Sequence, residues 1–243
     1  EPIRLLGESV LNGTILMILA TCTISTFATQ RGAHNIAIKG VRENDESTEH
    51  QDEHILIPVS NEESVRELVT LGNVLKSKKN HNGFYALHAI DNKVEDSGLE
   101  KRARKILETA AAAAASDIYL HELLRYDVNI SNAIASVAKE QSITDIVMGL
   151  HRDKSPAIFL GKITGDLLGE SNVTTYIYKP VQPLATIKRH IVIIPSQAEK
   201  EAGFLMWLHK IGNLARNTGT KIVVYAPETT LKYIEPLRRK QTA

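Results

Sequence analysis

The heptapeptide His54-Ile55-Leu56-Ile57-Pro58-Val59-Ser60 decides the fold of this 243-residue chain. Its middle is a short, continuous apolar run, which is the pattern of a strand covered on both faces in a parallel sheet. Parallel neighbours need crossover connections, and these are usually helices. The sequence after Ser60 should therefore alternate between helices and further strands.

The expected alternation is present. An amphipathic helix is predicted from about Glu62 to Lys78, and its apolar face comprises Val65, Leu68, Val69, Gly72 and Leu75. Further strands are predicted at residues 84–90, 118–124, 145–148 and 174–178, with helices at 98–116, at 130–141 and within 159–168. Five strands alternating with four helices predict an α/β fold with a doubly wound parallel sheet.

The same pattern starts again near residue 190. His190-Ile191-Val192-Ile193-Ile194-Pro195-Ser196 matches the first strand at an offset of 136 positions, from residue 54 to residue 190. Ile211-Gly212-Asn213-Leu214 matches Leu71-Gly72-Asn73-Val74, and residues 221–226 match the second strand. Three matches in the same order predict a tandem duplication whose second copy stops after strand, helix, strand and a basic tail at 238–240. Because two strands alone leave sheet edges exposed, this copy is expected to pack against the first or against another chain.

The start of the chain has an uncharged stretch of 22 positions from Ser9 to Gln30. A helix of this length spans roughly 33 Å, enough for a bilayer core of about 30 Å. It is interpreted as a transmembrane helix, with a buried helix of a soluble core as the alternative. Cys22 lies inside it and is expected to serve packing rather than redox or metal chemistry. Three basic residues follow between 31 and 42 against one before the stretch, which places the C-terminal side in the cytoplasm.

An acidic segment at residues 42–53, RENDESTEHQDE, has no aliphatic residue and is predicted to be a solvated linker. The chain is accordingly divided into the end of a membrane domain at 1–40, the linker at 41–53, a first α/β domain at 54–182 and a truncated second one at 189–243. With 29 basic and 28 acidic residues and no basic run interleaved with aromatics, nucleic acid is not expected as a partner. The nine histidines show no metal spacing and no catalytic constellation stands out, so neither a metal site nor an enzyme is expected.

Three phrases resemble the universal stress protein family: HILIPVS at 54–60, ALHAI at 86–90 and TDIVMGLHRDKSPAIFLGKITGDLL at 144–168. The resemblance covers about residues 53–180 and begins again from 189. It implies strand order 3-2-1-4-5, a tendency to form homodimers, and ATP or another adenine nucleotide as ligand.

The resemblance also implies where a nucleotide would bind. Nucleotide-binding members carry Gly-x2-Gly-x9-Gly-Ser/Thr after the fourth strand, where glycines let backbone N–H groups approach phosphates. Here Gly149 holds the first place, Arg152 replaces the second glycine, Gly161 arrives one position early, and Lys162 replaces the hydroxyl residue. Ser60 stands where those members usually have an aspartate.

Two interpretations of this degenerate loop stay open: a basic mouth that holds an anion, or a structural turn with solvated charges. The basic mouth would comprise His151, Arg152, Lys154 and Lys162. ATP is expected to bind weakly or not at all. His88, on the second predicted strand, is expected to be a packed core histidine rather than a ligand.

The opening LNGTILMILATCTISTFATQRGA, at 11–33, resembles the last transmembrane helix of bacterial monovalent cation/proton antiporters, some of which carry tandem stress-protein domains. The resemblance implies the cytoplasmic regulatory tail of a multi-pass inner-membrane Na+/H+ or K+/H+ antiporter. Its partners would be the upstream transport domain, the lipid bilayer through residues 9–30, and a second copy. The alternative is a soluble nucleotide-binding stress-protein module. Further apolar spans before Glu1 and further strand-helix units after Ala243 are expected on the first interpretation.

Overall fold

The computed structural model describes residues 12–25, 53–78, 80–93, 98–114, 118–150, 160–201 and 203–241, the last five of these by their backbone alone. The chain divides into two compact units, Glu1–Gln51 and Asp52–Ala243. Each unit is described by itself.

The larger unit contains a parallel five-stranded sheet with the order β3-β2-β1-β4-β5. Its strands are β1 (Ile55–Pro58), β2 (Phe84–Asp91), β3 (Leu120–Asp127), β4 (Asp145–Gly149) and β5 (Thr174–Tyr178). The predicted α/β fold and the strand order implied by the resemblance are both confirmed.

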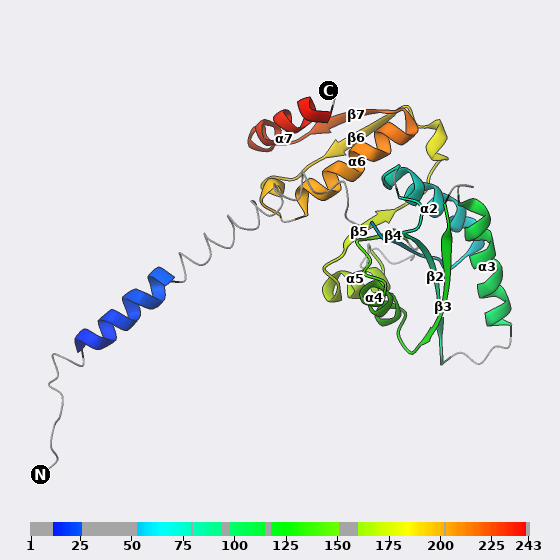
Figure 1. Ribbon diagram of the computed structural model, residues 1–243, viewed down its shortest axis with the longest axis horizontal. Coiled ribbons are helices and arrows are strands. Elements are labelled where there is room, and N and C mark those ends of the chain that lie inside the picture. Colours follow the sequence, from blue (N-terminus) through cyan, green and yellow to red (C-terminus); the bar gives the residue numbers. More distant parts are fainter. Residues whose placement is uncertain are drawn as a thin grey trace, which may run out of the picture. The chain divides into compact units, whose positions relative to one another are not determined.

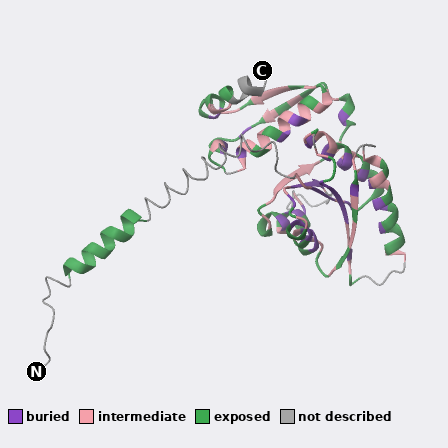
Figure 2. Ribbon diagram, in the orientation of Figure 1, coloured by how far each residue is buried: buried purple, intermediate pink, exposed green. Residues whose placement is uncertain are grey.

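Helices cover both faces of this sheet (Figure 1). They are α2 (Glu62–Leu75), α3 (Leu99–Ala113), α4 (Ile130–Glu140) and α5 (Lys162–Glu170). On the α2–α3 face, Ile57 of β1 packs in one core with Leu68 of α2. On the opposite face, Leu56 packs with Ile134 of α4 and Leu167 of α5. Coverage of both faces explains why β1 reads as a continuous apolar run, and Figure 2 shows the central strands as buried.

A second, two-stranded parallel sheet follows in the same unit. It comprises β6 (Arg189–Ile193) and β7 (Lys221–Tyr225), with the helices α6 (Phe204–Thr218) and α7 (Glu228–Gln241) and the short 3-10 helices η1 (Leu184–Thr186) and η2 (Ala198–Lys200). Ile194 and Phe204 form the centre of a small core with side chains of α6 and α7 packed around them. The other face of the strands is open, because Ile191 and Ile193 are 58% and 78% exposed.

The two copies of the internal repeat correspond in the structure with an offset that differs by one residue from the offset obtained by matching identical residues. Val192 and Ile194 face the α6 core, whereas Ile57 and Val59 face the α2 core. Ile194 N also donates to Tyr225 O of β7, as Val59 N does to Leu87 O of β2, and the residues before them, Ile193 and Pro58, are paired with Tyr225 and Leu87. Ile194 therefore corresponds to Val59, an offset of 135 rather than 136. The correction matters because a slip of one residue exchanges the two faces of a strand.

The β6–β7 part packs against the five-stranded part, as expected for a sheet with open edges. Leu214 of α6 joins the core that contains residues of α2, and α6 and α2 lie in contact. Residues 228–241 form a further helix, α7, that was not predicted from the sequence, and the basic residues at 238–240 belong to it. Pro236 lies inside this helix, where proline is unfavourable.

In the smaller unit, residues 12–25 are helical. The helix exposes its large apolar side chains, which are Ile15, Leu16, Met17, Ile18, Leu19 and Ile24. Cys22 is exposed too, contrary to the expectation that it packs, because no other described element of this unit lies beside it. The predicted span of residues 9–30 lies partly outside the described residues. Within the described ranges, no helix combines the length and apolar character needed to cross a membrane.

Candidate functional site

The strand order reverses direction between β1 and β4, and ligands of open α/β sheets bind beyond the carboxyl ends of strands at such a switch point. Ser60 follows β1 and is exposed, and Gly149 is the last residue of β4. Gly161 and Lys162 begin α5. The topology thus brings Ser60 and Gly149 to one edge. Arg152, together with His151 and Lys154, lies outside the described residues.

The start of α5 has the features of an anion-binding backbone. Gly161 has φ 74° and ψ 157°, a conformation essentially restricted to glycine. No side chain caps α5, and exposed Lys162 adds a positive charge at its first turn. Unpaired N–H groups and the helix dipole favour a negative group at such a terminus.

The neighbouring helix start is different. Asn61 caps α2, because its Oδ1 accepts hydrogen bonds from Ser64 N at 2.8 Å and Ser64 Oγ at 2.7 Å. At Gly149, an added Cβ would lie 3.5 Å from Leu68 Cδ1, an ordinary contact. Steric crowding by described atoms therefore does not require glycine at this position. Of the two helices that follow β1 and β4, α2 has a side-chain cap and α5 has none.

His88 lies in the middle of β2 and is half-buried. Burial lowers the pKa of its imidazole, and a hydrogen bond with the Val59 backbone opposes this with a smaller effect. Its Nδ1 is buried and has no hydrogen-bond partner among the described residues. His88 is therefore held neutral beside the end of β1, in line with its prediction as a packed histidine.

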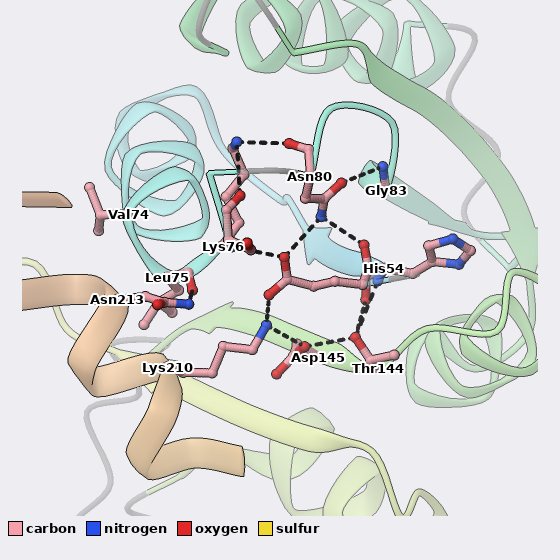
Figure 3. A network of polar contacts seen from close by, with 12 residues as sticks. His54, Val74, Leu75, Lys76, Asn80, Gly83, Thr144, Asp145, Lys210 and Asn213 are labelled. Atoms are coloured by element: carbon pink, nitrogen blue, oxygen red, sulfur yellow. Dashed lines mark hydrogen bonds and ion pairs between the residues drawn. The ribbon is translucent and has the colours of Figure 1, made fainter. Parts of the chain in front are cut away.

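A second polar cluster, which the sequence did not reveal, lies at the opposite, amino edge of the sheet (Figure 3). Glu53 precedes β1, and Asp145 begins β4. Lys210 of α6 forms ion pairs with both, through Glu53 Oε1 and, at 3.0 Å, Asp145 Oδ2. The three side chains are 8%, 15% and 4% exposed for Lys210, Glu53 and Asp145. These three residues are called the Lys210 cluster below.

Hydrogen bonds fix the two carboxylates. Glu53 Oε2 accepts from Ser77 N at 2.9 Å and from Asn80 Nδ2 at 3.1 Å. Asp145 Oδ2 accepts from Thr144 Oγ1 at 2.7 Å. Burial, followed by the negative charge of nearby Asp145, raises the pKa of the Tyr176 phenol. Tyr176 therefore stays neutral, and the charge of this region comes from carboxylates and ammonium groups.

Two asparagines of α6 cap the carboxyl end of α2. Asn213 Nδ2 donates to Leu75 O at 3.2 Å, and Asn217 Nδ2 donates to Val74 O at 2.9 Å and to Lys76 O at 3.1 Å. The last carbonyls of a helix have no partner within the helix. Helix α6 supplies these partners from 138 or more positions away in the sequence.

One sequence signal could have indicated this contact. Trp207, Lys210, Leu214 and Asn217 recur at the spacing of one helix face, and Asn213 lies beside them. Polar residues that interrupt an apolar face indicate buried polar partners. The identity of those partners, Glu53 and Asp145, has no signal in the local sequence.

No protein-family model matches the sequence, and no curated protein matches it. Among solved structures, a universal stress protein from Archaeoglobus fulgidus DSM 4304 aligns with 79% of this chain and 74% of its own, at 16% identity and a TM-score of 0.54. The segment from β1 to β5 is only about half of the chain. The likeness therefore extends beyond the five-stranded sheet.

Two shorter matches have ligands in their descriptions. A universal stress protein in complex with cAMP aligns with 54% of this chain and 98% of its own (16% identity, TM-score 0.42). The universal stress protein from Archaeoglobus fulgidus in complex with dAMP aligns with 51% and 96% (16% identity, TM-score 0.41). At these identities the comparisons bear on the fold alone, and the longer match, with its TM-score of 0.54, shows it: the five-stranded part has the fold of the universal stress proteins.

Proposed function

We propose that the part of the chain from Glu53 onward is a universal-stress-protein-like regulatory module that binds a small anion, in particular an adenine nucleotide, at the carboxyl edge of β1 and β4. The observation that carries this proposal is the start of α5, where Gly161 at φ 74° leaves the helix without a side-chain cap and Lys162 adds a cation. The proposed role is sensing rather than catalysis.

Binding should be weak. Ser60 offers no carboxylate for a nucleotide, and Arg152 stands where close backbone approach needs glycine. The remaining attraction comes from exposed charge, which salt screens over about 10 Å at 0.1 M.

Calorimetric titration with ATP, ADP and AMP at low and high salt tests this proposal. Lys162→Ala should weaken binding by no more than about fivefold, because an exposed ion pair contributes ~0.2–1 kcal/mol. The matched control is Lys101→Ala, which removes an exposed lysine of α3. Absence of binding by all three nucleotides at low salt would contradict the proposal. Micromolar, salt-insensitive affinity would show instead that the substituted loop works as a complete nucleotide site.

We further propose that this module is the cytoplasmic regulatory tail of a monovalent cation/proton antiporter of the inner membrane. The helix at residues 12–25 favours this candidate, because it exposes a continuous apolar surface with Leu16 at 72% and Leu19 at 66%. Such a surface on a protein is a site for lipid or for another protein. The division proposed from the sequence, at 1–40, 41–53, 54–182 and 189–243, then corresponds to membrane end, linker and two tail domains. A homodimer is part of this proposal.

Vesicle flotation distinguishes the antiporter-tail proposal from the alternative of a soluble module. On the antiporter proposal the chain floats with vesicles, and Leu16→Asp with Leu19→Asp abolishes flotation because a charge in the bilayer core is costly. Leu231→Asp, at a 40% exposed position of α7, is the control. A chain that stays at the bottom of the gradient would favour the soluble module. Cation/proton exchange in vesicles carrying the full reading frame, with and without residues 53–243, then measures regulation.

A further inference from the structure

Helix α6 places one ammonium group between two carboxylates of the five-stranded part. Both Lys210 and Asp145 are buried. Removing one partner of a buried ion pair leaves an uncompensated buried charge, which is far more destabilising than losing an exposed pair. The ammonium group of Lys210 is therefore the buried positive charge that compensates the carboxylates of Glu53 and Asp145.

In the polar contacts described above between α6 and the five-stranded part, α6 supplies the donors and the five-stranded part supplies the acceptors. Lys210, Asn213 and Asn217 of α6 donate to acceptors on or next to β1, β4 and α2. Helix α6 ends on its own capping residue, Gly219, which is left-handed at φ 67°. The end of α2 thus depends on α6, whereas the end of α6 is satisfied locally.

We propose that the Lys210 cluster is a charge-dependent docking contact that holds α6 and the β6–β7 sheet on the five-stranded part. While all three groups are charged, α6 stays docked and the end of α2 is capped. When the charge balance is lost, α6 separates and both the end of α2 and the start of β4 loosen. Strand β4 is only five residues long and connects Asp145 to Gly149, so the contact acts on the strand that ends at the proposed ligand edge.

This inference does not rest on nucleotide binding and is tested without ligand. Lys210→Met keeps most of the side-chain volume and removes the charge. Hydrogen exchange is measured at residues 72–77 and 145–149, together with the rate of protease cleavage in the connection at 179–188. We expect at least a tenfold increase in both for Lys210→Met. Arg216→Met, at an exposed position of the same helix, should match the unmodified protein. Unchanged exchange and cleavage in Lys210→Met would overturn the proposal.

A second variant distinguishes the effect of an unbalanced buried charge from the effect of altered packing. The triple variant Glu53→Gln, Asp145→Asn and Lys210→Met removes every charge of the cluster, and neutral replacement of a buried ion pair is often tolerated. We expect its cleavage and exchange rates to return to within about threefold of the unmodified protein. This comparison stays valid if Lys210→Met alone fails to fold. A triple variant as open as the single one would show that packing, and not charge balance, holds α6.

Discussion

The two sheets of the larger unit begin with nearly the same sequence and reach different states of burial. Leu56 of β1 is fully buried, whereas its counterpart by hydrogen-bond register, Ile191 of β6, is 58% exposed. Both strands have helices on one face, but only β1 has α4 and α5 on the other. A continuous apolar run in the sequence therefore shows that a strand can be covered by helices on both faces. Whether helices cover both faces depends on the other elements of the fold.

The helix ends give a second contrast between the two parts. Helix α2 ends at Lys76 in an extended conformation, and besides the local bond from Lys76 N to Gly72 O it takes donors for its last carbonyls from α6. Helix α6 ends at the left-handed Gly219, whose N–H bonds to Ala215 O. The five-stranded part, which has the larger core, is the one that depends on its neighbour for a helix cap.

The largest expected effect comes from truncating the paired strand residues. Leu56→Ala should lower the free energy of unfolding by ~2–5 kcal/mol, because it leaves a cavity between β1 and two helices. Ile191→Ala should change it by less than about 1 kcal/mol, because the side chain is already in water. Urea unfolding of the two variants measures both values. An equally large loss for Ile191→Ala would show that the open face of β6 is covered in solution.

Close packing in the five-stranded part predicts the next effect. A Cβ at Gly72 would lie 2.8 Å from Phe84 Cζ and 3.0 Å from Ile57 Cδ1. Gly72→Ala should therefore destabilise the protein by ~1–3 kcal/mol in urea unfolding, although alanine is the better helix former. Gly165→Ala, in α5 with nothing within 4 Å, should be neutral or stabilising by up to about 1 kcal/mol. Equal stability of the two variants would mean that α2 shifts away from the sheet at no cost.

The helix ends predict effects of about 1 kcal/mol that differ in location. Gly219→Ala should cost roughly 1–2 kcal/mol, because a left-handed conformation is unfavourable for alanine. Asn217→Ala should cost about 1 kcal/mol through loss of its bonds to Val74 O and Lys76 O. Hydrogen exchange distinguishes them, with faster exchange near α6 for the first and near α2 for the second. Faster exchange of α6 alone in Asn217→Ala would contradict the capping of α2.

The smallest effect concerns two histidines. Burial lowers the pKa of both His88 in β2 and His190 in β6, so folding favours their neutral forms. Their contribution to stability is complete above the unfolded pKa of about 6.5 and is lost as pH falls below it, since the unfolded chain then binds more protons. His88→Phe and His190→Phe should each reduce the loss of melting temperature between about pH 7.5 and 5.5. If only His88→Phe reduces this loss of melting temperature, then water reaches His190 in the two-stranded β6–β7 sheet.

The sequence predicted the elements well wherever burial is periodic. Helix α2 buries the face expected for it, including Val65 and Leu75, and β5 has the predicted bounds. The repeat offset was one residue off, because His54 and His190 match as letters but not in the faces that follow them. The Lys210 cluster was missed because its buried ion pairs join segments that are far apart in the sequence, 157 positions for Lys210 and Glu53, and such pairs leave no local periodicity. For the candidate site, Ser60, Gly149, Arg152, Gly161 and Lys162 all stay predictions, and Arg152 lies outside the described residues.

The β6–β7 sheet has a consequence for how the protein associates. Among the described residues, neither outer edge of this sheet is paired with another strand, and one face presents Ile191, Ile193 and Tyr225 to water. The two edges belong to different strands that run parallel, so addition of a further parallel strand creates a new edge each time. A further strand of the same chain, or a strand of a second copy, would fit such an edge. Light scattering over a range of concentrations distinguishes the outcomes, because a mass that levels off at twice that of the chain indicates the proposed two-fold dimer, whereas a mass that keeps rising indicates repeated strand addition.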